Sequence, residues 1–244
     1  MFQANIKMET LKEVVDITAT LVAETKLNIT KKGIELRTVD LAHVAMIDLF
    51  VSSSAFTSYK SKDSEIGINL DKLKDVLRLA KAGDEIQIKH DEEKTKLVVK
   101  VGNITRRMAL VDTAGMSDPK VPSLDLATKV TLKTTDLHRG IQAAVGVSDH
   151  VAFVARPDGF DIVAEGDTDN VSLNLDKEKL ENLECKEKVR SMFPIEYLSR
   201  IVKEIKGENV TLNLGNDFPV RIEFDIAEGN GHVVYLLAPR IENA

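Results

Sequence analysis

Met8-Glu-Thr-Leu-Lys-Glu-Val-Val15, followed by Lys31-Lys-Gly33-Ile-Glu-Leu36, occurs a second time, in altered form, later in the chain. The second copy reads Thr134-Thr-Asp-Leu-His-Arg-Gly-Ile141, followed by Arg156-Pro-Asp-Gly159-Phe-Asp-Ile162. The two glycines at corresponding positions, Gly33 and Gly159, are 126 residues apart. A repeat that keeps its register over this distance indicates a duplicated domain. Duplication is typical of a part built into a symmetric assembly, and it argues against an enzyme with a single pocket.

The length and composition support two domains with aliphatic cores. The chain has 244 residues, of which 43% are hydrophobic, 5% are aromatic and none is Trp. Charged residues make up 30%, with both signs interspersed and a net charge of −6. We expect a first domain at 1–111, a connector at 112–126 and a second domain at 127–244.

The cysteine content and the apolar runs indicate the compartment. The chain has a single cysteine, Cys185, which excludes a disulfide within the chain and fits a reducing interior. No apolar run approaches the roughly 20 residues needed to cross a bilayer. The first residues lack the uninterrupted apolar stretch of a signal peptide. We therefore expect a soluble intracellular protein.

Two periodicities predict the fold class. Many short runs alternate between apolar and polar residues, as in 33–39, 44–51, 85–89 and 96–101 and in their counterparts at 160–164, 170–175, 209–214 and 220–226. Four segments instead carry apolar stripes at the helical period, beginning at Leu11, Leu70, Leu137 and Ile195. We predict an α+β fold in which each half contains two βαβββ-type units, with the helices on one face of antiparallel sheets.

The stretch at 112–126 contains Gly115, Pro119 and Pro122, which exclude regular structure and indicate an extended connector. It also carries four apolar residues, Met116, Val121, Leu124 and Leu126. They could fasten the connector to a sheet, or they could form one wall of a binding groove. The sequence leaves both possibilities open.

Motifs for catalysis, metal binding and cofactor binding are absent from the sequence. There is no phosphate-binding Gly-x-x-x-x-Gly-Lys-[Ser/Thr], no His-Glu-x-x-His, no Gly-x-Ser-x-Gly and no Cys-x-x-Cys. The histidines are scattered and never spaced i, i+4: His43, His90, His138, His150 and His232. We expect no catalytic residues, no metal site, no cofactor and no enzymatic activity.

Basic residues recur on the polar sides of the expected helices. They are Lys12, Lys74, Arg78, Lys81, Arg139, Arg200, Lys203 and Lys206. Such residues are often an ordinary solvated helix face. If all four helices lie on one side of the sheets, however, these charges converge on one surface. That surface would attract phosphates, and contacts of this kind carry no sequence information.

Four stretches of the chain together resemble the proliferating cell nuclear antigen (PCNA) family of sliding clamps, with an archaeal character. They are the opening Met1-Phe2 with 11–15, the Asp40-x-x-His43-Val44 element, Phe56-Thr-Ser-Tyr59, and the ending Leu237-Ala-Pro-Arg-Ile-Glu242. These stretches are distributed over essentially the whole chain. The resemblance implies a homotrimeric ring around double-stranded DNA that acts as a processivity factor in DNA replication and repair.

The resemblance also implies the subunit interface and the location in the cell. It assigns one sheet edge to residues near 105–110 and the complementary edge to residues near 170–175. The interface residues are then Thr105, Arg107, Leu110, Val171, Leu173 and Leu175. The protein would be cytoplasmic and nucleoid-associated in a prokaryote, or nuclear in a eukaryote.

Partner proteins of the family bind through short peptide motifs, and the resemblance implies a pocket for them. The expected partners are the clamp loader, DNA polymerase, flap endonuclease and DNA ligase. No association with a membrane is expected. The matching positions here are Val39, His43, Val44, Met46, Met116, Pro119, Phe218, Pro219, Leu236, Leu237, Ala238 and Pro239. Plain core packing is the alternative role for most of them.

Two other classes of function remain as alternatives to a homotrimeric clamp. One is a monomeric or dimeric interaction scaffold, or a checkpoint-type clamp subunit that acts only in a heteromer. The other is a hydrolase on a duplicated α+β fold. The molar mass in solution discriminates between the homotrimeric ring and the scaffold, because a trimer of 27.0 kDa chains has a mass of about 81 kDa.

Overall fold

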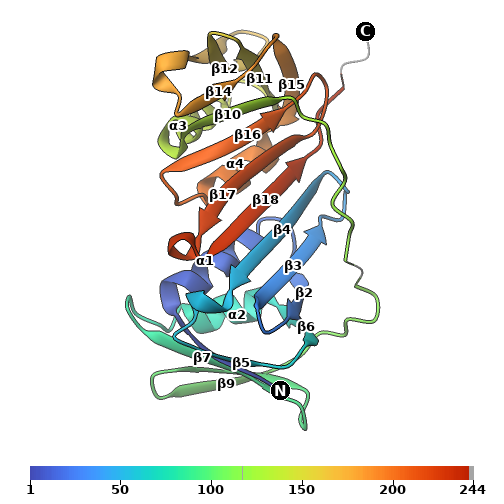
Figure 1. The fold of residues 1–244 in the computed structure, drawn as a ribbon, viewed down its shortest axis with the longest axis vertical. Helices are drawn as coiled ribbons and strands as arrows, with labels where there is room; N and C mark the ends of the chain where they lie inside the picture. Colours follow the sequence, from blue (N-terminus) through green and yellow to red (C-terminus); the bar gives the residue numbers. More distant parts are fainter. Residues whose placement is uncertain (117, 242–244) are drawn as a thin grey trace. The chain divides into compact units, whose positions relative to one another are not determined.

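The computed structural model describes residues 1–116 and 118–241, which pack as two compact units (Figure 1). Unit 1 comprises residues 1–41, 47–120 and 225–233. Among the described residues, unit 2 comprises 42–46, 121–224 and 234–241. The order of elements repeats once along the chain, so that the first eleven strands and helices correspond to the last eleven.

The first set of elements is β1 (Phe2–Lys7), α1 (Met8–Thr18), β2 (Glu24–Ile29), β3 (Gly33–Val39), β4 (Ala45–Ser52), β5 (Ser58–Ser61), β6 (Ser64–Asn69), α2 (Leu70–Leu77), β7 (Glu85–Asp91), β8 (Lys96–Val101) and β9 (Ile104–Ala109). The second set is β10 (Thr128–Lys133), α3 (Thr134–Ala144), β11 (His150–Arg156), β12 (Gly159–Glu165), β13 (Asn170–Asp176), β14 (Asn182–Glu184), β15 (Val189–Pro194), α4 (Ile195–Lys203), β16 (Asn209–Leu214), β17 (Val220–Ile226) and β18 (Gly231–Leu237). Short 3-10 turns lie at Ser53–Ala55, Lys177–Lys179 and Ala227–Gly229. Each set contains two βαβββ-type units with one additional short strand, β5 or β14. The predicted α+β fold is therefore confirmed.

Within the described residues the strands form three antiparallel sheets. The five-stranded sheet has the order β5-β1-β7-β8-β9, and the four-stranded sheet has the order β13-β12-β11-β15. The nine-stranded sheet has the order β14-β10-β16-β17-β18-β4-β3-β2-β6. Corresponding strands occupy corresponding places, so the sequence repeat is a repeat of topology as well.

Helix α2 begins where the sequence supplies both a starting signal and an apolar stripe. Asn69 caps α2, because its side-chain oxygen accepts a hydrogen bond from Lys72 N at 2.9 Å. Leu70, Leu73, Val76 and Leu77 form the buried side of that helix. All four expected helices are present, and each contains the residue at which its sequence stripe begins: Leu11, Leu70, Leu137 and Ile195.

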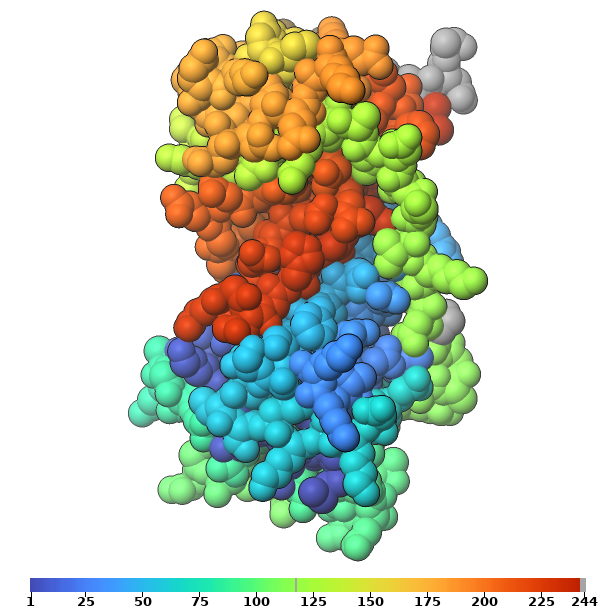
Figure 2. Space-filling view, in the orientation of Figure 1, coloured from blue at the N-terminus to red at the C-terminus, as the bar shows by residue number. Residues whose placement is uncertain are grey.

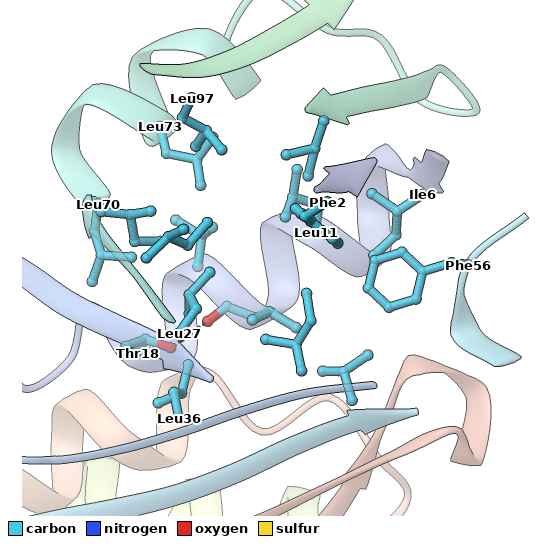
Figure 3. A pocket seen from close by; sticks show the side chains of 17 residues that line it. Phe2, Ile6, Leu11, Thr18, Leu27, Leu36, Phe56, Leu70, Leu73 and Leu97 are labelled. Atoms are coloured by element: carbon cyan, nitrogen blue, oxygen red, sulfur yellow. Dashed lines mark hydrogen bonds between the residues drawn. The ribbon is translucent and has the colours of Figure 1, made fainter. Parts of the chain in front are cut away.

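The core of unit 1 is a layer of aliphatic side chains between its helices and its sheets. Leu11 of α1 and Leu70 of α2 line the same apolar pocket as Phe2 and Ile6 of β1 and Leu97 of β8 (Figure 3). Helices α1 and α2 also contact each other, as do α3 and α4 in unit 2. The two helices of each unit therefore cover the same apolar layer.

The repeated glycines have a steric cause. A Cβ atom on Gly33 would lie 2.1 Å from Val51 O, and one on Gly159 would lie 2.5 Å from Leu175 O. In each unit the carbonyl of the neighbouring strand fills the space that a side chain would need. The shared glycine thus permits the same close approach in both copies, between β3 and β4 and between β12 and β13.

Candidate functional site

Two sheet edges have the geometry to pair with another chain. Strand β9 is the last strand of its sheet in unit 1, and β13 is the last strand of its sheet in unit 2. Figure 2 shows the orange segment around residue 175, which includes β13, at the surface of unit 2. An exposed strand edge presents backbone donors and acceptors that a further strand can satisfy.

The hydrogen-bond phase of β9 identifies its outward groups. Residues of β8 and β9 pair so that Lys100 lies opposite Thr105 and Val98 opposite Arg107. The bond from Leu110 N to Thr95 O sets the phase of the ladder. In an antiparallel pair, hydrogen-bonded residues alternate with residues whose backbone groups point away. The backbone groups of Thr105 and Arg107 therefore point toward the open edge.

The same reasoning applies to β13. Gly166 N donates to Asp169 O at 2.9 Å, and Lys177 N donates to Asp158 O at 2.9 Å. Hydrogen-bonded pairs alternate along the ladder between these two bonds. Val171 therefore exchanges hydrogen bonds with Ala164 of β12, and Leu173 exchanges them with Ile162. The backbone groups of Ser172 and Asn174 consequently face the open edge, a distinction that sequence periodicity did not provide.

The side chains of the six predicted interface residues vary in burial. Thr105 and Arg107 are exposed, and Leu110 is half-buried just after β9. Val171 and Leu173 are half-buried and Leu175 is buried, so the apolar side of β13 contacts its own unit. Ile104, an exposed apolar residue at the start of β9, was not among the predicted interface residues.

The helix cations of unit 1 lie among carboxylates of the same helices. Asp16 pairs with Lys12 and also with Lys74, whose Nζ is 3.8 Å from Asp16 Oδ1. Arg78 Nη1 is 2.9 Å from Asp75 Oδ1. Exposed ion pairs of this kind contribute little to stability, so a phosphate can compete for the cations. Lys81 is exposed beyond the end of α2.

Unit 2 shows a similar arrangement, in which carboxylates also lie beside the helix cations. Arg139 Nη1 is 3.8 Å from Asp136 Oδ1, and Arg200 Nη2 is 3.4 Å from Glu196 Oε1. The Arg200 guanidinium also lies 4.9 Å from the centre of the Tyr197 ring. Lys203 and Lys206 are exposed, and Lys206 Nζ donates to Lys203 O at 3.0 Å.

Several residues predicted for the partner pocket lie close together in unit 2. Ala238 N donates to Val44 O at 2.9 Å, which holds the segment 236–239 beside 43–46. His43 has a left-handed backbone, with φ of 56°, and turns the chain into β4. The side chain of His43 is exposed, whereas Ala238 and Pro239 are half-exposed.

Phe218 is the most exposed large apolar residue among those predicted for the pocket, with 48% of its surface accessible. Its backbone is fixed by buried Ser191, whose Oγ accepts from Phe218 N at 3.3 Å and donates to Gly215 O at 2.6 Å. A partly exposed ring on a fixed turn next to Pro219 is suited to receive an apolar side chain from a partner.

Met46, Leu236 and Leu237 are buried in unit 2, with 8%, 7% and 0% of their surfaces exposed. In the single chain these residues pack in the core, as the alternative interpretation from the sequence proposed. The predicted Val39, Met116 and Pro119 belong to unit 1. Leu41, another apolar residue of unit 1, is 100% exposed and was not among the predicted pocket residues.

The connector is held to unit 1 by three polar side chains, those of Lys26, Asn28 and Asp118, which together are called the connector clamp or simply the clamp. The sequence analysis did not identify it. Lys26 Nζ lies 2.8 Å from Asp118 Oδ2, and Asn28 Nδ2 donates to Asp118 Oδ1 at 3.0 Å. The hydrogen bond from Lys26 lowers the pKa of Asp118, and Asp118 in turn raises the pKa of Lys26. Lys26 alternates with core residues of β2, so its pattern resembled that of a solvated strand face.

A metal-binding cluster and a membrane-spanning helix are both absent from the described residues. Among residues 1–116 and 118–241, no group of three or more His, Cys, Asp or Glu side chains is arranged to hold a metal ion. No helix in this part of the chain is long and apolar enough to cross a bilayer.

Comparison with known proteins gives consistent matches along the chain. Residues 1–114 match the family model described as the proliferating cell nuclear antigen N-terminal domain, and residues 120–240 match the C-terminal domain. DNA polymerase sliding clamps of Methanocella arvoryzae and Natronomonas pharaonis are each 41% identical, over all of both chains. The fold superposes with a TM-score of 0.94 on a structure titled "C-terminal region of FEN-1 bound to A. fulgidus PCNA", at 31% identity over all of both chains. PCNA from Thermococcus kodakaraensis gives a TM-score of 0.91 at 25% identity, covering 98% of this chain and 100% of that one.

Proposed function

Since this chain belongs to the proliferating cell nuclear antigen family, we propose that it is a DNA polymerase sliding clamp that works as a homotrimeric ring. The ring encircles double-stranded DNA and tethers replication and repair enzymes without catalysing a reaction. The observation that carries the proposal is the pair of open sheet edges, β9 and β13, on a duplicated chain. Their positions in the two copies indicate how they pair.

The internal repeat supplies a template for that pairing. By element order β9 corresponds to β18, and β13 corresponds to β4. Strands β4 and β18 are hydrogen-bonded neighbours within the chain. They run antiparallel, because Val44 bonds Ala238 whereas Ser52, further along, bonds the earlier Asn230. An antiparallel β9–β13 pair between copies would repeat this contact, and cyclic repetition would leave neither edge open.

DNA contact is assigned to the cations on and beside the four helices. Each helix pair covers one apolar layer, so its polar side is available to a ligand. Phosphate contacts from such residues carry no sequence information, and their affinity falls as salt rises. A tether of closed topology needs only weak contacts of this kind, since dissociation requires the ring to open.

Partner proteins are assigned to the segment 43–46, the turn at Phe218–Pro219, the segment 236–239 and the connector. The FEN-1 C-terminal region bound to A. fulgidus PCNA supports a short peptide as the ligand. Peptide segments from DNA polymerase, DNA ligase and the clamp loader would use the same site. An apolar cavity beside free backbone groups suits such segments, and about micromolar affinity would permit exchange between enzymes.

Sedimentation of the full-length protein tests the assembly. We expect a species of about 81 kDa, three times the 27.0 kDa chain, that remains a trimer at micromolar concentration. Retention on a circular plasmid, with release when the plasmid is linearised, tests encirclement. A stable monomer would instead support an interaction scaffold, and a complex formed only with other gene products would support a heteromeric clamp subunit.

A further inference from the structure

The connector is hydrogen-bonded to unit 1 through the side chain of Asp118. Val111 N donates to Gly67 O at 2.9 Å where the chain leaves β9, and Met116 N closes a turn onto Thr113 O at 2.9 Å. Beyond this turn, residues 118–127 make no backbone hydrogen bond in the described part of the chain. The carboxylate of Asp118 is thus the fixed point of an otherwise extended segment.

The receptor for this carboxylate is built into strand β2. Lys26 and Asn28 are two residues apart, so their side chains project from the same face of the strand. Lys26 binds Asp118 Oδ2 at 2.8 Å and Asn28 binds Oδ1 at 3.0 Å, which occupies both carboxylate oxygens. Glu65 of the adjacent strand lies 3.7 Å from Lys26 Nζ and adds a second negative charge.

Lys26 is 92% removed from solvent, since only 8% of its side chain is exposed. Lysines are rarely buried to this extent unless they are paired. If Asp118 moved away, Lys26 would keep only the more distant Glu65, and burying a poorly paired cation is unfavourable. The cost of exposing or unpairing Lys26 therefore opposes detachment of the connector.

We propose that Lys26 and Asn28 are positioning residues for partner binding, which hold the connector through Asp118 in the extended form that a partner peptide contacts. This inference rests on the proposed function, because it assumes that the connector residues Met116 and Pro119 belong to the partner site. A connector that is already ordered does not have to be ordered when the peptide binds. Removing the clamp therefore weakens peptide binding through entropy.

Limited trypsin digestion of the full-length protein tests the clamp without any partner. The Lys120–Val121 bond lies two residues beyond Asp118, and mass spectrometry reports its cleavage. We expect Asp118→Ala to accelerate cleavage at this bond about tenfold or more. Asp125→Ala, which changes another exposed connector aspartate, is the matched control and should leave the rate unchanged.

Calorimetry with a synthetic peptide from the FEN-1 C-terminal region tests the positioning role. We expect Asp118→Ala and Lys26→Met each to weaken binding about fivefold to tenfold, with the loss appearing in the entropy. The double variant should be no weaker than Asp118→Ala alone, because Asp118→Ala already removes the contact with Lys26. Lys26→Met keeps an apolar side chain of similar length, so it remains informative if other changes at this buried site fail to fold.

Each outcome decides the proposal. Unchanged cleavage at Lys120–Val121 in Asp118→Ala would show that the clamp does not hold the connector, and faster cleavage with unchanged peptide affinity would remove the positioning role. Additive losses in the double variant would also overturn it. If the unmodified protein bound no peptide, the partner site itself would be wrong, and the protease result would still report whether the clamp exists.

Discussion

Both units build the same strand pair at the point where the chain leaves the sheet, but they fasten the departing segment differently. In unit 1 Lys26 lies opposite Gly67 on β6, and in unit 2 Ala152 lies opposite Met192 on β15. Gly67 and Met192 each form an isolated bridge to the departing chain. Lys26 and Ala152 therefore occupy corresponding positions.

The next position on the same face differs as well. Asn28 lies opposite Glu65 in unit 1, whereas Val154 lies opposite Arg190 in unit 2. Unit 2 lacks both side chains of the clamp and has a cation where unit 1 has a carboxylate. Both units keep the backbone bond at this point, Val111 N to Gly67 O at 2.9 Å and Arg240 N to Met192 O at 2.7 Å. The side-chain contact differs, because in unit 2 it is Arg240 Nη1 that lies 2.8 Å from His150 Nδ1.

This difference shows that the strand pair folds without a buried lysine. The clamp in unit 1 is therefore a feature of the connector and not a requirement of the fold. A second difference concerns the sheet edges. Strands β4 and β18 are neighbours in one sheet, whereas β13, the counterpart of β4, and β9, the counterpart of β18, each end a sheet. Changes that remove one of these differences test what each contributes.

The largest expected effect comes from blocking the open edge of unit 2. Ser172→Pro removes an outward-facing N–H from β13 while leaving the in-phase bonds to β12 intact. We expect the mass in sedimentation to fall from about 81 kDa to that of the 27.0 kDa chain. Proline at Val171 or Leu173 would instead remove bonds to β12, so monomers released by those variants would also reflect damage within the unit.

Ser172→Ala is the control for the edge experiment, since it keeps the backbone donor, and it should remain trimeric. A trimer that survived Ser172→Pro with unchanged dissociation would mean that β13 is not the interface. The comparison between β13 and β4 would then have no bearing on assembly.

A smaller but still large effect is expected on DNA when the two helix faces are altered together. Arg78→Glu beside α2 and Lys203→Glu on α4 reverse one exposed cation in each unit. We expect about tenfold weaker DNA retention, equal on all sequences, and a salt dependence that is shallower by about one unit for each lost phosphate contact. Lys129→Glu, on the face of β10 opposite its buried Val130, is the control. Losses that depended on DNA sequence, or that were as large in the control, would contradict this face.

The fold could be predicted well because apolar periodicity is a local signal, and because the duplication can be read directly from the sequence. The four stripes beginning at Leu11, Leu70, Leu137 and Ile195 each became a helix, and the repeated Gly33 and Gly159 mark equivalent close contacts. Edge strands such as β9 were placed through the family resemblance. The outward phase of Ser172 could not be predicted, because it depends on which hydrogen bonds close the β12–β13 turn.

The partner site and the connector were harder to predict for a physical reason. Leu236 and Phe218 are both apolar, and only the packing shows that the first is buried and the second is half exposed. Lys26 lies in a strand that alternates polar and apolar residues, which resembles a solvated face. Its burial depends on Asp118, which is 92 residues further along the chain, and no local pattern reports such a contact.

The partner site allows a sharper substitution than those the sequence suggested. Leu236→Ser and Met46→Glu change buried side chains, so we expect them to abolish peptide binding but also to cost stability, about 2–5 kcal/mol for a large buried apolar residue. Phe218→Ala removes a half-exposed ring whose turn is held by backbone contacts to Ser191. We expect it to weaken the peptide about tenfold in calorimetry with little change in melting temperature. Leu79→Ala, an exposed leucine of unit 1, is the control, and equal affinity in both variants would place the peptide elsewhere.

The smallest expected effect is a shift in the titration of Asp118, and it tests the difference between the two units directly. Because the pKa of Asp118 is lowered from its usual 3.8, the clamp stabilises the folded connector above that pH and is lost as pH falls through the lowered value. Because the pKa of Lys26 is raised from 10.5, the clamp is also fully present below that pH and is lost only as pH rises further. Between about pH 5 and 9 the clamp should therefore be independent of pH. Carboxyl NMR should show the Asp118 midpoint rising toward its usual value in Lys26→Met, which removes the cation that unit 2 also lacks. A midpoint that stayed in place would show that Lys26 does not hold this carboxylate in solution, and that the two units fasten their departing segments less differently than their side chains indicate.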